Sequence, residues 1–195
     1  MLITISGQSG SGKNSTAERL ARKLRCRVVD AGTIFRDMGK KQGMDVIAFG
    51  QYVDAHPEID QALDEEMLRH AQNSTNVILL GRLTGWMTMR RDIPAVRVWL
   101  SATAETRAKR VVRREKISFQ QALQDTERRD RDNALRYKKL YGLDLNDLSP
   151  YDIVVVTDNR SLGQVVSLLS SRIPKIWLKI RQKQTPPPPK RSLNR

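Results

Sequence analysis

Cysteine and histidine are scarce in this sequence of 195 residues, which contains one cysteine and two histidines. Cys26 cannot form an internal disulfide, and its place in a predicted helix–sheet contact indicates a buried thiol in a reducing compartment. His56 and His70 stand apart from each other and from Cys26, so the ligand spacing of a transition-metal site is missing. No apolar run is long enough to cross a membrane, and no secretory signal pattern opens the chain. We therefore expect a cytoplasmic protein.

Acidic residues are few as well, 21 against 35 Lys and Arg, which gives a formal net charge of +14. Eight basic residues and no acidic one lie from Arg172 onward, and without those eight the charge on the rest of the chain is +6. A modest positive charge suits a protein whose ligands carry phosphates. The stronger basic signal predicts that nucleic acid or another polyanion binds the C-terminal end.

Apolar residues make up 39% of the chain, enough for a packed core in one domain of this length. Short apolar runs typical of strands alternate with helical patterns. This alternation predicts an α/β fold in which helices cover both faces of a parallel sheet. The predicted strands are residues 2–6, 27–30, 76–80, 95–100 and 152–156.

A glycine-rich loop at the start of the chain lies between the first predicted strand and the first helix. It has the spacing of the loop that cradles nucleotide phosphates in its backbone N–H groups, with a lysine that reaches the β- and γ-phosphates. Asn14 stands where this pattern has the hydroxyl residue that binds magnesium. We predict an ATP site in Gly7, Gln8, Ser9, Gly10, Ser11, Gly12, Lys13, Asn14 and Ser15.

Arginines recur where the chain leaves the carboxyl ends of the predicted strands, the edge at which open parallel sheets bind ligands. Arg36 follows the second strand and Arg82 the third. Positions 128, 131 and 132 of the long helix share one face. Alone, that face would read as a solvated charged surface. Together with the arginines at the strand ends, this helix face predicts a phosphate-binding site, because phosphoryl transfer depends on positioning and on charge stabilisation.

Several longer stretches resemble the cytidylate kinases of the archaeal type, which are nucleoside monophosphate kinases. The matching segments are Ala31 to Arg36, Gly43 to Asp45, Pro57 to Asp60, Gly81 to Met87, Arg136 to Lys138, Tyr141 to Gly142 and Asp147 to Asp152. The resemblance covers about residues 2–173. It implies a five-stranded P-loop kinase domain over residues 1–174, with a monophosphate-binding segment at about 33–73 and a lid at about 110–140.

The resemblance also implies the reaction, transfer of the γ-phosphoryl group of ATP to CMP or dCMP. Carried over to this chain, Lys13, Arg128 and Arg131 would be catalytic, and Gly32, Arg36, Arg82, Arg128 and Asp132 would bind the monophosphate. Base specificity cannot be read from spacing, so a kinase of AMP or UMP is the first alternative. The second is a nucleotide-binding protein that has lost catalysis and binds RNA through its basic end. The sequence does not indicate an oligomeric state.

Two departures from the related kinases concern magnesium. Asn14 replaces a hydroxyl, and Leu80 stands where an acidic residue usually precedes the Gly-Arg pair. An amide oxygen can still bind a hard cation. We therefore expect Asn14 and Asp30 to serve Mg²⁺, in part through water, and activity to be retained.

The residues after Pro174 change in character. Pro174 is expected to end the last helix, which Ser161 opens, and residues 175–195 to form a basic, proline-rich and disordered tail. Residues 176–180 could instead be a helical turn that covers the sheet or a segment that meets a membrane or a partner.

Overall fold

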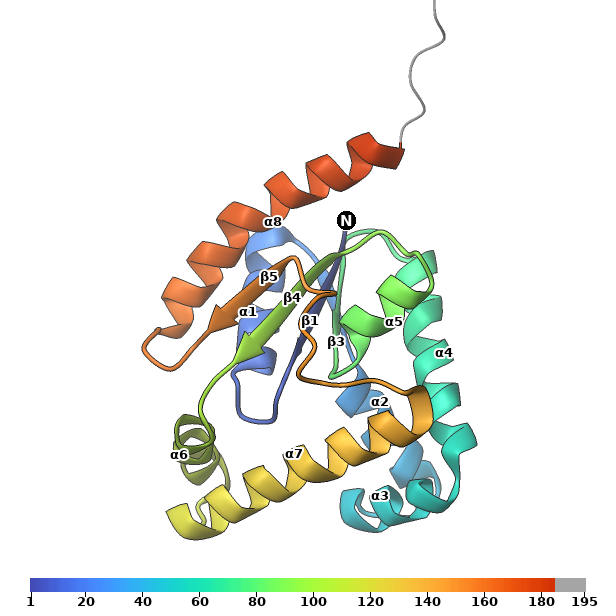
Figure 1. Ribbon diagram of the computed structural model, residues 1–195, viewed down its shortest axis with the longest axis vertical. Coiled ribbons are helices and arrows are strands. Elements are labelled where there is room, and N and C mark those ends of the chain that lie inside the picture. Colours follow the sequence, from blue (N-terminus) through green and yellow to red (C-terminus); the bar gives the residue numbers. More distant parts are fainter. Residues whose placement is uncertain (185–195) are drawn as a thin grey trace, which may run out of the picture.

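The computed structural model describes residues 1–184 and contains one sheet of five parallel strands in the order β2-β3-β1-β4-β5. The α/β fold expected from the sequence, a five-stranded parallel sheet with helices on both faces, is confirmed (Figure 1). Each strand begins or ends within one residue of its prediction. The strands are β1 Leu2–Gly7, β2 Arg27–Asp30, β3 Val77–Leu80, β4 Val96–Ser101 and β5 Ile153–Val156.

Helices lie on both faces of the sheet, and one long helix, α7, crosses below the carboxyl ends of the strands (Figure 1). Helices α1 and α8 cover one face, and α4 and α5 lie on the other. The helices are α1 Lys13–Leu24, α2 Ala31–Lys41, α3 Val46–Ala55, α4 Pro57–Asn73, α5 Thr84–Arg90, α6 Ala104–Glu115, α7 Phe119–Tyr141 and α8 Leu162–Gln184.

The core divides along the two faces of the sheet because alternate strand residues point to opposite sides. Ile3 and Ile5 of β1 pack with Leu20 of α1 and Leu169 of α8, and all four are fully buried. On the other face, Leu79 packs with Met67 of α4 and its neighbours. The core thus fixes β1, and with it the glycine loop at its end.

Helix α8 corrects the sequence prediction at its C-terminal end. It runs through Pro174 to Gln184, so the prediction that Pro174 ends the helix is wrong. A proline inside a helix removes one hydrogen bond and clashes with the preceding turn, at a cost of roughly 3 kcal/mol. Burial offsets that cost, because Ile173 before the proline and Ile176 and Ile180 after it pack on the core, while Pro174 itself is exposed.

The same packing decides between the two interpretations of residues 176–180. Ile176, Trp177 and Ile180 lie against the core cluster, so this segment covers the sheet. Residues 175–184 are therefore helical, and the expected disordered tail does not begin at residue 175. The four prolines and the last three basic residues, Lys190, Arg191 and Arg195, lie outside the described residues.

Helix α5 was not predicted. Its seven residues follow directly on the Gly81-Arg82 pair, and it is too short for a helical period to show in the sequence. Gly85 is required there by close packing, since a Cβ at this position would lie 2.3 Å from the ring of Tyr151. Within residues 1–184, no helix has the length and apolarity needed to cross a membrane.

Candidate active site

The glycine loop joins β1 to α1, as the sequence predicts. Gly10 has a φ of 79°, a conformation that side chains disfavour, and a Cβ there would lie 2.9 Å from Cβ of Arg107. At Gly7 a Cβ would meet the carbonyl oxygen of Leu100 at 2.1 Å. Both positions require glycine, because the loop is pressed against β4 and α6.

The N-terminus of α1 is open to an anion. Gly12 precedes the helix, no side chain caps it, and its first turn contains no acidic residue. The first N–H groups of a helix lack partners within the helix and carry a partial positive charge. The predicted phosphate-binding loop therefore ends in a local electropositive site, as phosphate binding requires.

Lys13 is half-buried at this helix start, and its Nζ donates a hydrogen bond of 2.8 Å to the carbonyl oxygen of Gln8. The pKa of Lys13 is lowered to about 7, mainly by burial and also by the positive charge of Arg82, whereas Asp30 opposes the shift. A negative phosphate would reverse the shift, because it favours the charged ammonium.

Two arginines of α6, Arg107 and Arg110, donate hydrogen bonds to backbone carbonyl oxygens of the phosphate loop. The sequence analysis gave neither residue this role. Arg107 is only 3% exposed and pairs with Asp130 of α7 at 2.7 Å. It also donates to the carbonyl oxygens of Ala102, at 3.0 Å, and of Ser9, at 3.3 Å. One buried guanidinium thus joins the phosphate loop, the end of β4 and α7. Arginine-rich helices are common, so the sequence alone does not indicate that Arg107 is buried while other arginines of α6 are exposed.

Arg110 makes a second tie. It donates to the carbonyl oxygen of Gly10 at 3.2 Å and to that of Thr157 at 2.8 Å. A cleft of about 530 Å³ runs from the phosphate loop along this side, between α6 and the turn after β5. Its lining includes the loop from Gly10 to Thr16, together with Arg113, Arg114 and Arg160. The cleft has room and positive charge for the rest of a nucleotide whose phosphates lie in the loop.

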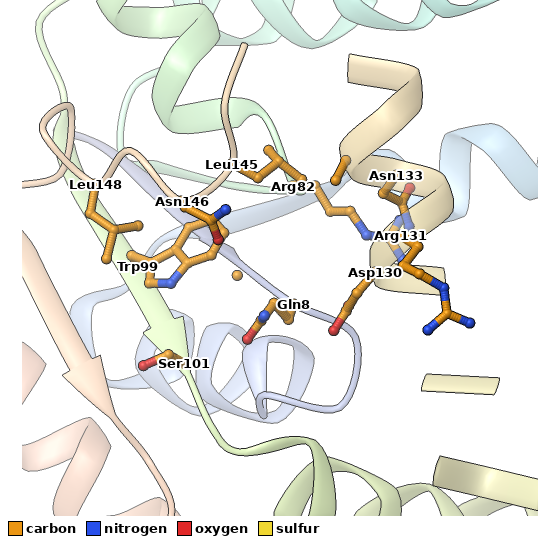
Figure 2. A pocket seen from close by; sticks show the side chains of 12 residues that line it. Gln8, Arg82, Trp99, Ser101, Asp130, Arg131, Asn133, Leu145, Asn146 and Leu148 are labelled. Atoms are coloured by element: carbon orange, nitrogen blue, oxygen red, sulfur yellow. The ribbon is translucent and has the colours of Figure 1, made fainter. Parts of the chain in front are cut away.

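A second cavity, of about 380 Å³, opens on the other side of the loop (Figure 2). Gly7 at the end of β1 and Gln8 of the loop line it, Arg82 enters from the turn after β3, and Asp130 and Arg131 lie on α7. Figure 2 shows Arg82 reaching toward α7 and the Asp130 carboxylate pointing toward the loop. Trp99, Ser101, Asn133, Ala134, Leu145, Asn146 and Leu148 complete the wall.

Of the three residues of the long helix that we expected at the site, one lines the cavity. Arg131 lines the cavity, but Arg128 is exposed and pairs with Asp125 of its own helix at 3.0 Å. Asp132 is exposed and outside the lining. The face of α7 nearest the loop carries Asp130 and Asn133 instead. Roles for Arg128 and Asp132 remain predictions that would require α7 to move.

Asp30 has a local role at the start of α2. Its carboxylate accepts hydrogen bonds from the Gly32 amide at 3.0 Å and from Thr33 at 2.9 Å, which caps the helix. Arg36 folds back to Thr33 and lies 3.6 Å from Asp30. Arg36 is half-exposed and lies outside the lining of the 380 Å³ cavity. The start of its helix is nevertheless close to Arg82 in the sheet, because Asp30 is paired in register with Leu80 of β3, two residues before Arg82.

The candidate magnesium ligands fit a cation that arrives with a nucleotide. Asn14 is exposed beside Lys13, and its amide makes no hydrogen bond within residues 1–184. Leu80 is buried in the core and offers no oxygen. No cluster of three metal-binding side chains exists in this part of the chain. Nucleotide-bound magnesium needs only one or two protein ligands, which Asn14 and Asp30 could supply.

A group of carboxylates lies between α4 and α7, and the sequence analysis gave it no role. Arg136 of α7 donates two hydrogen bonds, at 2.6 and 2.9 Å, to the buried Asp60. Burial raises the pKa of Asp64 to about 6, although a hydrogen bond from Tyr141 opposes the shift. Burial raises the pKa of the neighbouring Tyr137 hydroxyl, whereas the positive charges of Arg82 and Arg136 oppose the shift.

Residues 2–159 match the cytidylate kinase-like family. The cytidylate kinase of Methanocaldococcus jannaschii is 40% identical over 174 residues, which are 89% of this chain and 97% of the relative. That of Pyrococcus abyssi is 38% identical over 180 residues, 92% of this chain and 97% of the relative. That of Thermoplasma acidophilum is 39% identical, covering 89% and 92% of the two chains.

Solved structures support the fold. An uncharacterized protein from Eubacterium ventriosum superposes with a TM-score of 0.70 at 17% identity, over 89% of this chain and 98% of the other. Shikimate kinase from Bacteroides thetaiotaomicron gives 0.58 at 13% identity, over 90% and 97%. These likenesses speak for the P-loop kinase fold alone. The family match over residues 2–159 and the alignments with cytidylate kinases over about nine-tenths of the chain establish the family. Together with the phosphate loop, they show that this chain belongs to the cytidylate kinase-like family.

Proposed function

We propose that this protein transfers the γ-phosphoryl group of ATP to CMP, and to dCMP, in the cytoplasm. One observation carries the proposal: the phosphate loop lies between two cavities, the 530 Å³ cleft beside Arg110 and the 380 Å³ cavity that Arg82 enters. A donor in the cleft and an acceptor in the cavity would bring their phosphates together at the loop. The family's cytidylate kinases supply the identity of the acceptor.

The donor side would work by positioning and charge. The backbone amides of the loop and the open N-terminus of α1 would hold the phosphates. Lys13 would leave the Gln8 carbonyl oxygen and stabilise the migrating group. Replacing Lys13 by Ala should lower kcat at least about a hundredfold, as for other preorganised charges that face a transition state.

Asn14, and Asp30 through water, would hold the magnesium that accompanies ATP. When bound, this ion would neutralise charge that develops on the phosphates. Asp30 can accept further hydrogen bonds from water beyond those of Gly32 and Thr33, since a carboxylate has about four acceptor positions. The chain thereby keeps a site for magnesium without the hydroxyl at position 14.

On the acceptor side, Arg82 would bind the phosphate of CMP, and Arg36 would join it by turning away from Asp30. Arg131 lies across the cavity on α7, where it would stabilise the transferring group. Guanidinium groups suit this work because they stay charged and make multidentate contacts with phosphate oxygens.

Asp64 is our candidate for recognition of the cytosine base. The exocyclic amine of cytosine donates hydrogen bonds, and carboxylates accept them from it. Uracil presents a carbonyl oxygen at the same position, which a carboxylate repels. Asp60 is already engaged by Arg136, whereas Asp64 accepts a hydrogen bond from Tyr141 and keeps further acceptor positions. Asp64 lines a separate cavity of about 400 Å³, so the base would extend there from the 380 Å³ cavity that holds the phosphate.

The test is to incubate the full chain with ATP, magnesium and CMP and to measure both products. The proposal predicts CDP and ADP in equal amounts, and neither in the absence of CMP. ADP without CDP would make the protein an ATPase. Tight nucleotide binding without either product would favour the alternative, a nucleotide-binding protein without catalysis.

A further inference from the structure

Helix α8 carries a row of basic residues that the kinase reaction does not use. Arg172, Lys175, Lys179 and Lys183 are all exposed, and none forms an ion pair within residues 1–184. Residues spaced by three and four positions share one helix face, so these four lie in line. At a rise of 1.5 Å per residue the row is about 16 Å long. No acidic residue occurs anywhere in α8.

Several arginines elsewhere in the described chain form ion pairs. Arg107, Arg128 and Arg136 pair with aspartates, and Arg69 and Arg91 pair with glutamates. The row on α8 has no such counter-charge among the described residues, and it lies on a helix without any acidic residue. The helix itself is fixed, because Ile173, Ile176 and Ile180 anchor it to the core on both sides of Pro174.

We propose that this row, the α8 basic row, binds the phosphate backbone of single-stranded RNA. Charge complementarity favours a polyanion, and cations spaced along one helix face suit a flexible strand that can follow them. The phosphates of a duplex curve away from a straight line. Contacts of this kind depend on the backbone and carry no sequence preference.

A membrane surface fits less well. Helices that lie on membranes bury an apolar face among the lipids. The apolar face of α8 already packs on the sheet, and Leu178 is its one strongly exposed large apolar side chain within the described residues. Only electrostatic attraction would remain. The row also lies outside the lining of the two cavities beside the phosphate loop, so RNA binding there leaves the kinase reaction free.

The test uses a fluorescent 20-nucleotide oligouridylate and the full chain, with binding measured by anisotropy over a range of salt concentrations. A variant with Lys175→Gln, Lys179→Gln and Lys183→Gln removes three charges from the row. Its control, Arg19→Gln, Arg22→Gln and Lys23→Gln, removes three exposed charges from α1. Counterion release amounts to about 0.7 per neutralised phosphate in a plot of log K against log salt.

The row variant should therefore show a slope shallower by about 2 and affinity about a hundredfold weaker at 0.1 M salt, whereas the control should match the parent. Phosphorylation of CMP should be unchanged in both variants. Equal binding by parent and row variant would overturn the proposal. So would a duplex of equal length bound as tightly as the single strand, or vesicles containing phosphatidylserine that bind the parent when the RNA does not.

Discussion

Replacing Arg107 by Met tests whether one buried arginine holds the phosphate loop against α7. The methionine keeps an apolar stem of similar length but removes the guanidinium. The carbonyl oxygens of Ser9 and Ala102 then lose their donor, and Asp130 loses its counter-charge. An unpaired buried acceptor costs about 1–3 kcal/mol, and removal of one partner of a buried pair about 3–5 kcal/mol.

These costs overlap, and Asp130 is 27% exposed, so water can compensate part of its lost partner. We expect the free energy of unfolding to fall by about 3 kcal/mol, near the lower end of the range for a broken buried pair. For a chain of this size that corresponds to a drop in Tm of about 6–12 °C. Urea denaturation and calorimetry would measure the two quantities.

Arg69→Met is the matched control, because Arg69 pairs with Glu66 at the surface, where solvent screens the ion pair and its loss should change stability little. Adding Asp130→Asn to Arg107→Met should recover part of the loss, since it removes the unpaired charge. The KM for ATP should rise in the Arg107 variant, because Ser9 belongs to the loop. If Arg107→Met were as stable as Arg69→Met, the buried tie would be unimportant and our reading of α6 would be wrong.

Three further predictions concern the reaction. At pH 8 the binding of ATP should be accompanied by uptake of close to one proton, because the phosphates raise the pKa of Lys13 from about 7. Calorimetry in two buffers of different ionisation enthalpy would measure this proton uptake, and Lys13→Met should abolish it. Asp64→Asn should reduce the preference for CMP over UMP about tenfold in kcat/KM. In the parent, this preference should fall as the pH drops through about 6, because Asp64 becomes protonated. An unchanged CMP-to-UMP ratio of kcat/KM would exclude Asp64 from base recognition. Asp30→Asn should raise the magnesium concentration needed for activity about tenfold, whereas Asn14→Ser should lower it or leave it unchanged; a parent-like titration would reduce Asp30 to a helix cap.

The backbone of the site could be predicted because it follows from local rules. The strand, glycine loop and helix around Lys13 have a spacing that few other structures share, and the five strands carry near-continuous apolar runs. Ser161 also marked the start of α8 correctly, and its hydroxyl accepts a hydrogen bond from the Gln164 amide.

Side-chain partners could not be predicted in the same way, because pairing depends on tertiary placement. The sequence shows many arginines, but only the packing of α6 on the loop buries Arg107, and only the direction of α7 turns Asp130 inward and leaves Arg128 outside. The course of α8 was missed for a related reason. Proline lowers the local preference for helix, and the burial of Ile176 and Ile180, which outweighs it, is a long-range effect.

The most direct test of the proposed function is a comparison of kcat/KM for CMP, dCMP, UMP and AMP, each with ATP and magnesium at saturating concentrations. The account predicts that CMP exceeds UMP and AMP at least about tenfold, which corresponds to roughly 1.4 kcal/mol in transition-state binding. It also predicts that dCMP is phosphorylated. Equal values for CMP, UMP and AMP would contradict the assignment of a cytidylate acceptor, even if phosphoryl transfer itself were efficient.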